Sequence, residues 1–290
     1  MAAVVNTGDD FIKYGLKICP DLDTISYTLS GLVNPETGWG RIQESYNSRA
    51  TLADLGDDPW FALGDKDIGL HMFRTELLAE GYSLTQVTER IATAFGIEPR
   101  LLPMSNEPVA TMVLAQIEGR EGKADTMELE FQEYFVKHHH QPKVLRVRYD
   151  GIASAKPTKE VLTVLEDAET IVIAPSNPIL SIGPILALEG VFELLNRRRD
   201  RVVAVSPIIS GKAVKGPLAQ ILESLLDQHD VRTVAELYRE IASGIVIDRS
   251  DADLAGSIEE IGLKAHLADT LMSTRKDAAR LAELTLEALR

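Results

Sequence analysis

The sequence predicts a doubly wound α/β protein in which a mostly parallel sheet carries an inserted cap lobe of helices and a β-hairpin. Four short apolar runs rich in β-branched residues are typical of buried parallel strands. They cover residues 2–6, 170–174, 202–206 and 244–248. Each of the first three leads into a turn-rich segment and then a helical pattern, the alternation expected of such a sheet. Because ligands bind at the carboxyl ends of the strands in this fold class, we expect the loops after these runs to carry the function.

The long segment between the first two predicted strands has a character of its own. The predicted core comprises residues 1–50 and 165–290, and the predicted cap lobe comprises residues 51–164. Apolar residues at helical spacing over residues 65–97 indicate two helices, with Gly81-Tyr82-Ser83 as the break and cap. Alternating polar and apolar residues over 127–150, around Gln141-Pro142, indicate a β-hairpin. Residues 267–289 have the amphipathic pattern of a surface helix.

Composition and charge argue against several classes of protein. With 290 residues, 45% of them apolar, the chain can bury a substantial core. A net charge of -14 argues against general binding to nucleic acid, which needs a basic surface. The apolar runs are far shorter than the roughly 20 residues that cross a bilayer, so we expect no membrane span. The single cysteine, Cys19, and the lack of a basic, apolar leader before the first strand predict a cytoplasmic protein.

Two acidic motifs lie close together near the start of the chain. The first, Asn6-Thr7-Gly8-Asp9-Asp10, projects two carboxylates at the end of the first predicted strand, and the second is Pro20-Asp21-Leu22-Asp23-Thr24. Carboxylates packed so closely repel one another unless they are solvated, protonated or neutralised by a cation. The first motif is also compatible with a solvated turn, and Asp23 with the N-cap of a helix over residues 24–32. Oxygen-only ligands at such a site favour Mg²⁺.

The loop after the second predicted strand is rigidified by three prolines and a glycine. It offers backbone amides together with Ser176, Asn177 and Ser181. These groups can bind an anionic ligand above the sheet, or the loop can be purely structural.

The loop after the third predicted strand brings lysines into an otherwise acidic protein. It starts at Ser206 and contains Lys212 and Lys215 beside two glycines. A lysine in this place can pair with phosphate as a point charge, or it can be a solvated loop charge. A separate turn cluster over residues 34–40 carries Trp39, which is either a ring-stacking surface or a packed corner.

Taken together, these segments resemble the 2-phospho-L-lactate transferase family, which builds the deazaflavin coenzyme F-420. The matching pieces occur in order and cover nearly the whole chain. They are Val4-Val-Asn-Thr-Gly-Asp-Asp-Phe11, Ile18-Cys-Pro-Asp-Leu-Asp-Thr24, Tyr27-Thr-Leu29, Pro35-Glu-Thr-Gly-Trp-Gly40, Trp60-Phe61 with Leu63-Gly-Asp65, Leu102-Pro-Met-Ser105, Phe131-Gln-Glu-Tyr-Phe135, and residues 174–186 and 206–217.

The resemblance implies a Rossmann-like core, commonly dimeric, with the cap lobe binding the acceptor. It implies transfer of a phospholactyl, phosphoenolpyruvyl or phosphoglyceryl group from a guanosine diphosphate-linked donor to 7,8-didemethyl-8-hydroxy-5-deazariboflavin, with release of GMP. By motif, Asp9 and Asp23 are the Mg²⁺ ligands and catalytic residues, and Asp10 and Asp21 are supporting acids. The remaining implied substrate-binding residues are Asn6, Thr7, Gly8, Trp39, Ser176, Asn177, Ser181, Ser206 and Lys215.

The chain departs from the family pattern at its start. The family carries, before the first strand seen here, another strand and a glycine-rich turn of the Gly-Gly-x-Gly-Gly-Ala-Lys kind, so we expect the native start to lie upstream. A non-catalytic nucleotide-sugar-binding regulatory protein is the alternative function, but such a binder has no need of the acid pairs. An NAD-dependent dehydrogenase would need a Gly-x-Gly-x-x-Gly turn after a strand, and the sequence has none.

Overall fold

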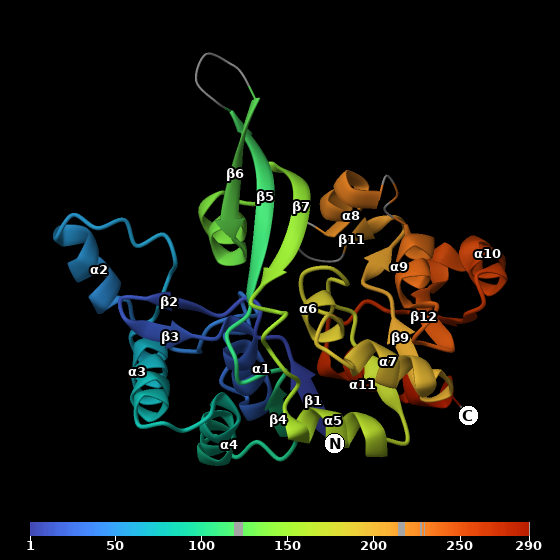
Figure 1. The fold of residues 1–290 in the computed structure, drawn as a ribbon, viewed down its shortest axis with the longest axis horizontal. Helices are drawn as coiled ribbons and strands as arrows, with labels where there is room; N and C mark the ends of the chain where they lie inside the picture. The colour runs from blue at the N-terminus through green and yellow to red at the C-terminus, as the bar shows by residue number, and fades with distance from the viewer. Residues whose placement is uncertain (119–123, 214–217, 227, 229, 290) are drawn as a thin grey trace. The chain divides into compact units, whose positions relative to one another are not determined.

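The computed structural model describes residues 1–118, 124–213, 218–226, 228 and 230–289, which Figure 1 shows as a ribbon. The chain forms two compact units. The first comprises Met1–Val113, Glu128–Gln141 and Arg148–Val161, and the second comprises Leu114–Met127, Pro142–Val147 and Leu162–Arg290. Residues 51–113 thus share a unit with residues 1–50, whereas the sequence-based division placed them in separate lobes.

The pairing of the first strand explains this grouping. Strand β1 (Ala2–Val5) pairs in parallel with β4 (Arg100–Pro103), which comes from the predicted cap lobe. Within the first unit, β4 is thus the neighbour of β1, a pairing that the sequence does not indicate. A hydrophobic run predicts a strand, but it does not say which strand lies beside it.

A tight hairpin and a helix follow β1 and position the acidic motifs. Strands β2 (Phe11–Lys13) and β3 (Leu16–Ile18) pair antiparallel around Tyr14 and Gly15, whose φ angles of 54° and 75° suit a two-residue hairpin turn. Helix α1 (Pro20–Ser30) begins at Pro20 rather than at Thr24 as predicted. The fixed φ of proline suits the first helical position.

The early start of α1 corrects the role predicted for one aspartate. Asp23 lies inside the first turn together with Asp21, and the N-cap position belongs to Cys19, which makes no side-chain cap. Asp23 is therefore not an N-cap. Both carboxylates lie at the positive end of the helix dipole, which favours negative charge.

The two helices predicted over residues 65–97 are confirmed as α3 (Asp65–Ala79) and α4 (Leu84–Ala94). Their apolar faces pack with α1 into a buried cluster. The cluster consists of Tyr27, Leu70, Leu77, Val87 and Ile91. The predicted break and cap is also confirmed, because Ser83 and Gln86 form a reciprocal capping box at the start of α4.

Replacing Ser83 with alanine should lower the free energy of unfolding by about 1 kcal/mol, because the amide of Gln86 loses its acceptor. Urea denaturation measures this change. Ser83→Thr keeps the hydroxyl and should retain most of the stability. An equal loss in both variants would show that the cap is not the cause.

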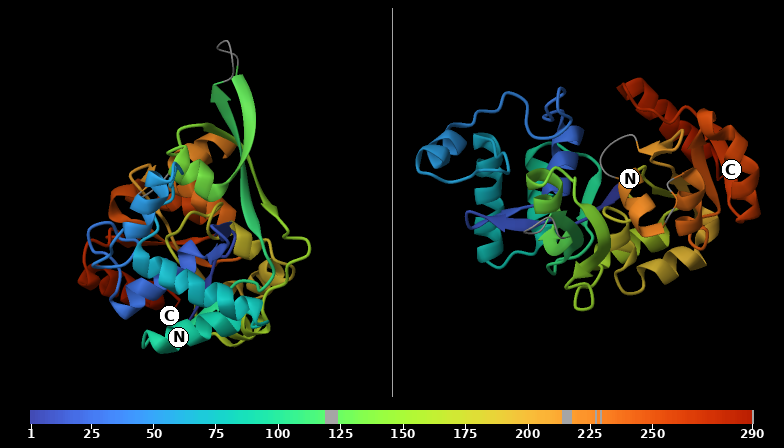
Figure 2. Two further views of the ribbon diagram at one scale, coloured as in Figure 1. Left: turned by 90° about the vertical axis from the view of Figure 1, so that its left-hand side faces the viewer. Right: turned by 90° about the horizontal axis from the view of Figure 1, so that it is seen from above.

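The predicted hairpin over residues 127–150 is wrong in its pairing. Strands β6 (Ala124–Glu130) and β7 (Lys143–Asp150) both exist, but they flank β5 (Ala110–Glu118) in the order β6-β5-β7. The segment between them contains a short π-helix, Glu133–Lys137, in place of a simple turn. Figures 1 and 2 show β5 and β6, in green, as a long twisted pair. Alternation predicted the strands correctly, but it cannot choose between partners of similar pattern.

The second unit contains the parallel sheet that the sequence predicts. Strands β8 (Ile171–Ile173), β9 (Val202–Val205) and β12 (Gly244–Asp248) confirm three of the predicted strands. They form one sheet in the order β13-β12-β9-β8, with every pair parallel. The added strand β13 (Lys264–Ala268) includes the first residues of the predicted C-terminal helix, which is confirmed only as α11 (Arg275–Glu287). The α/β fold class is therefore confirmed.

Short elements complete both units. In the first unit, α2 covers Asn47–Asp54. In the second, the elements are α5 (Lys159–Asp167, which begins in the first unit), α6 (Gly183–Leu186), α7 (Val191–Arg197), a 3-10 turn (Arg199–Arg201), β10 (Ile208–Ile209), β11 (Lys212–Ala213), α8 (Leu218–Leu226), α9 (Val231–Tyr238), a 3-10 segment (Arg249–Leu254) and α10 (Ala255–Glu260). Across the described residues, every helix is too short or too polar to pass through a bilayer.

Candidate functional site

The two acidic motifs meet at the carboxyl end of β1. The amide of Gly8 donates to Oδ1 of Asn6 at 2.8 Å, and Nδ2 of Asn6 donates to Oδ2 of Asp21 at 3.0 Å. The turn is also held from β5, because the amide of Thr111 donates to the carbonyl of Gly8 at 2.6 Å. Asp9 is only 6% exposed, so the interpretation of this motif as a solvated turn is wrong.

Asp9 is the least neutralised of the four acids. Its Oδ1 is buried and has no hydrogen-bond partner among the described residues. Burial, followed by the charges of Asp21 and Asp10, raises the pKa of Asp9 well above its ordinary value. The side chains of Asn6 and Thr111 lower this pKa and offset only part of the rise. Burial likewise raises the pKa of Asp21 to about 6. Negative charge at this point is therefore costly unless a cation compensates it.

Asp10 and Asp23 are compensated by basic residues that the sequence reasoning missed. The ammonium of Lys17 lies 3.1 Å from Oδ2 of Asp10. The guanidinium of Arg74, on α3, is buried and contacts both carboxylate oxygens of Asp23, with Nη1 donating to Oδ2 at 3.2 Å. Nη1 of Arg74 also donates to the carbonyl of Lys17 at 3.1 Å. Arg74 occupies the apolar stripe of an amphipathic helix, and a lone cation in such a stripe is the signal that could have indicated a buried partner.

A second polar layer lies behind Asp23. Nδ1 of His71 is 3.6 Å from Oδ2 of Asp23, and burial lowers the pKa of this histidine to about 4, so the ring is neutral near pH 7. The hydroxyl of Tyr27 donates to Oδ1 of Asp67 at 2.6 Å, and burial raises the pKa of Asp67 to about 6. This layer holds α1 against α3 and thereby fixes the first turn of α1.

The arrangement around Asp9 fits a hard cation. In this turn and on the neighbouring β5, several buried oxygens have no hydrogen-bond partner among the described residues: Oδ1 of Asp9, both carboxylate oxygens of Asp10, and the hydroxyls of Thr7 and Thr111. The described residues contain no group of three or more His, Cys, Asp or Glu side chains that could hold a metal. Mg²⁺ does not need such a group, because it usually keeps several waters and uses one or two carboxylates together with substrate phosphates. Asp9, with Asp21 nearby, suits that pattern.

The predicted residues of the second unit are largely engaged in local structure. Oδ1 of Asn177 accepts from the amides of Ile179 and Leu180 at 2.9 and 3.0 Å, which shapes the loop after β8. Ser206 is buried, and its hydroxyl accepts from the amide of Ile208 at 3.1 Å. These bonds explain a serine and an asparagine in these loops without a ligand.

Three further predicted residues have different outcomes. The amide of Ser181 donates to the carbonyl of Asn177 at 2.9 Å, and the amide of Ser176 donates to the carbonyl of Ala174 at 2.7 Å, so the backbone of this loop is ordered by its own turns. Trp39 is 52% exposed, which excludes a packed corner and leaves its ring accessible. Lys215 lies outside the described residues.

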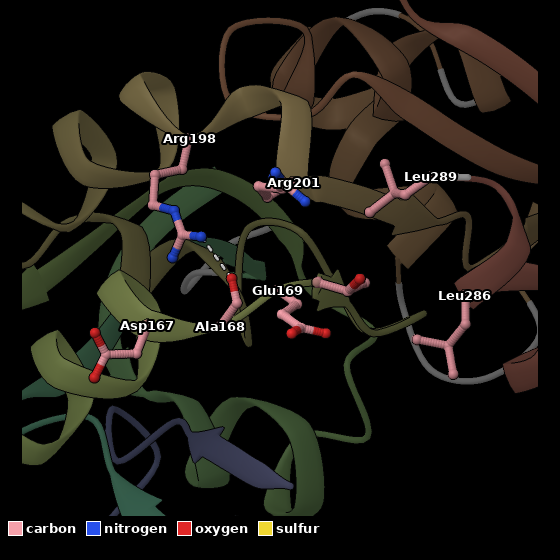
Figure 3. A pocket seen from close by; sticks show the side chains of 8 residues that line it. Asp167, Ala168, Glu169, Arg198, Arg201, Leu286 and Leu289 are labelled. Carbon is pink, nitrogen blue, oxygen red and sulfur yellow. Dashed lines mark hydrogen bonds between the residues drawn. The ribbon is translucent and has the colours of Figure 1, made fainter.

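The second unit also contains a cavity of about 660 Å³, which Figure 3 shows. It is lined by Asp167, Ala168, Glu169, Thr170, Arg198, Arg201, Leu286 and Leu289. Most of these residues directly precede β8 and β9, so the cavity lies at the amino ends of the parallel strands. Nη2 of Arg198 donates to the carbonyl of Ala168 at 2.5 Å, so this guanidinium is used to cap the end of α5. Ligands of such sheets bind at the opposite, carboxyl ends.

Comparison with known proteins matches residues 1–287 to the model of the family described as 2-phospho-L-lactate transferase CofD. The chain belongs to this family. It is 37% identical to a phosphoenolpyruvate transferase of Kitasatospora aureofaciens, over 99% of this chain and 88% of that protein. It is 36% identical to a 2-phospho-L-lactate transferase of Methanocaldococcus jannaschii, over 99% of this chain and 89% of that protein.

A solved structure supports the fold. A Bacillus halodurans protein of the upf0052 family is similar with a TM-score of 0.58 at 15% sequence identity, covering 98% of this chain and 91% of that chain. Membership of the 2-phospho-L-lactate transferase family confirms the predicted enzyme, a transferase of coenzyme F-420 biosynthesis. The non-catalytic regulatory protein is not favoured.

The buried acids of this transferase predict an unusual pH dependence of stability. Because the pKa of Asp21 is raised to about 6, the folded state holds a proton that the unfolded state releases near pH 4. Stability from this group is therefore present at low pH and is lost as the pH rises from about 4 to about 6. In EDTA, the free energy of unfolding of the wild type should fall across this range relative to Asp21→Asn, by on the order of 2 kcal/mol. Parallel pH profiles for the two proteins in urea denaturation would contradict this assignment.

Proposed function

We propose that this transferase moves a three-carbon phosphoacid group from a guanosine diphosphate-linked donor to 7,8-didemethyl-8-hydroxy-5-deazariboflavin and releases GMP. The observation that carries the proposal is the buried carboxylate of Asp9 at the carboxyl end of β1, whose Oδ1 has no hydrogen-bond partner among the described residues. Such a group suits a cation that neutralises phosphate. The names of the relatives include both phosphoenolpyruvate transferase and 2-phospho-L-lactate transferase, at almost equal identity. We therefore leave the donor to experiment.

We propose Mg²⁺ as the cation. When bound, it would supply the positive charge that stabilises the departing GMP. Asp9 would hold it, and Asp21 is the carboxylate whose charge acts most strongly on Asp9. The side-chain amide of Asn6 orients Asp21. The bond from Thr111 to the carbonyl of Gly8 keeps the turn that carries Asp9 against β5.

Asp23 as the second ligand stays a prediction. Both of its oxygens contact Arg74, so direct binding to the cation requires the guanidinium to release one of them. A paired Asp23 would instead orient the first turn of α1, which also carries Asp21. Lys17 and Arg74 place two positive charges behind the acids, which limits the net negative charge that a phosphate would meet.

The other predicted residues have proposed roles in substrate binding. Since Oδ1 of Asn177 is engaged, its Nδ2 group is the part that would donate to a donor phosphate, together with the hydroxyls of Ser176 and Ser181. We propose that Trp39 stacks on a ring of a substrate. We propose that Lys215 pairs with phosphate, and that Ser206 orients the start of its loop.

We further propose a homodimer in the cytoplasm. The single cysteine supports a reducing compartment, because Cys19 is fully buried and burial raises the pKa of its thiol, as expected of a packing residue. With this cysteine as a packing residue, the enzyme would need no disulfide for its stability.

The proposed homodimer can be tested by measuring the oligomeric state by sedimentation or light scattering.

The proposed function is tested by mass spectrometry of the products. The chain is mixed with the deazaflavin acceptor and each of the three guanosine diphosphate-linked donors, in Mg²⁺ and in EDTA. We expect GMP and the modified acceptor in Mg²⁺ with one preferred donor, and no turnover in EDTA. Binding of guanosine nucleotides without turnover of any donor would contradict the proposal and support a binding protein.

A further inference from the structure

Thr111 lies beside the turn that carries Asp9 and has no role in the chemistry proposed above. It is the second residue of β5 and is 1% exposed, and its amide donates to the carbonyl of Gly8 at 2.6 Å. This bond places Thr111 directly against the turn that carries Asp9.

The hydroxyl of Thr111 is buried without a hydrogen-bond partner among the residues that the structure describes. Burying an unpaired hydroxyl costs about 1 to 3 kcal/mol. Valine has nearly the same shape and suits a strand, and it would fill the same space without this cost. A threonine here is therefore poorly explained by packing alone. In the part of the chain that the structure describes, Oδ1 of Asp9 is also buried without a partner, and both side chains line the same small cavity.

A small cavity adjoins both side chains. It is about 10 Å³ in volume and is lined by Gly8, Asp9, Asp10, Phe11, Ala110, Thr111, Glu130, Phe131 and Gln132. This volume is close to the minimum that holds one water molecule. A single water there would find polar partners on Asp9 and Thr111. Mg²⁺ retains waters of this kind when few carboxylates bind it.

From these observations we propose that Thr111 is a positioning residue for the cation site, holding the carboxylate of Asp9 through a water in the small cavity. The proposal rests on the proposed function and adds a residue to that site. Thr111 acts through Asp9 and does not itself contact the cation. Groups that orient a metal ligand in this way typically change metal affinity by 10- to 100-fold.

The test uses the full chain and Mn²⁺ as the probe, with binding measured from the loss of the free-ion signal in electron paramagnetic resonance. Thr111→Val should weaken Mn²⁺ binding about 10- to 100-fold, and Thr111→Ser should restore most of it. The Mg²⁺ concentration for half-maximal GMP release should rise by the same factor in Thr111→Val, with kcat at saturating Mg²⁺ nearly unchanged. Thr233→Val is the matched control, because Thr233 is also buried and its hydroxyl has no partner among the described residues, but it lies in the second unit.

Several outcomes would overturn the proposal. Wild-type Mn²⁺ affinity in folded Thr111→Val would show that the hydroxyl has no part in the site, and the proposed function would stand if GMP release persists. If Thr111→Val does not fold, Thr111→Ser and Thr111→Ala provide the comparison, since only serine keeps the hydroxyl, and equal affinity in these two also overturns it. A wild type that neither binds Mn²⁺ nor releases GMP would overturn both the inference and the proposed function.

Discussion

Asp9→Asn is expected to lower turnover by about a thousandfold, while the metal-free protein stays as stable as the wild type or becomes more stable. The activity falls because asparagine carries no charge to hold the cation, and each lost 1.4 kcal/mol of transition-state stabilisation costs a factor of about ten. The stability is kept because Asp9 is buried beside Asp21 and Asp10, and its charge opposes folding at neutral pH. Steady-state GMP release and thermal melting in EDTA measure the two effects.

The combination of lost activity and kept stability is the informative result. Asp200→Asn serves as a control, because that exposed carboxylate lies in the second unit and pairs with Arg201 on the surface. It should leave both measurements nearly unchanged. Unchanged turnover in Asp9→Asn would refute the assignment of Asp9 to the cation site.

Arg74→Met should have the largest effect on stability, lowering the free energy of unfolding by about 3 to 5 kcal/mol. The guanidinium compensates the buried charge of Asp23 and also donates to the carbonyl of Lys17. Without it, a buried carboxylate is left unpaired, and removal of one partner from such a pair is much more damaging than removal of both. Urea denaturation at neutral pH measures the loss.

A double variant and a surface control sharpen this prediction. Arg74→Met combined with Asp23→Leu should regain much of the stability, because no buried charge then remains unpaired. Arg90→Met removes a guanidinium that lies on the exposed surface 3.9 Å from the ring centroid of Tyr82, and it should cost only about 0.5 to 1 kcal/mol. A double variant no more stable than Arg74→Met would show that the arginine acts through packing.

The double variant also separates two roles for Asp23. If Asp23 is a cation ligand, as the family motif implies, the refolded double variant should bind Mn²⁺ much more weakly than the wild type. If Asp23 serves only to pair with Arg74, Mn²⁺ affinity should stay within a few-fold of wild type once the fold is restored. The geometry, with both oxygens of Asp23 facing Arg74, makes this comparison decisive.

Much of the molecule follows from local patterns in the chain. The β-branched runs predict β1, β8, β9 and β12 because such residues suit buried strands, and the amphipathic pattern with Ser83 predicts α3, α4 and the cap between them. The acidic motifs stand out by their residue types and by their place after the first predicted strand, and the comparisons confirm the family that they resemble. These features depend on residues that are close together in the chain, so local sequence patterns predict them.

What only the folded chain decides is which distant residues meet. The pairing of β1 with β4, the central place of β5 between β6 and β7, and the contact of Arg74 with Asp23 across 51 residues have no local signature. The same holds for Thr111, an ordinary strand residue until β5 brings it to Gly8. The physical reason is that a strand edge or a buried charge accepts many partners of similar chemistry, and the choice among them is made by packing the whole chain at once.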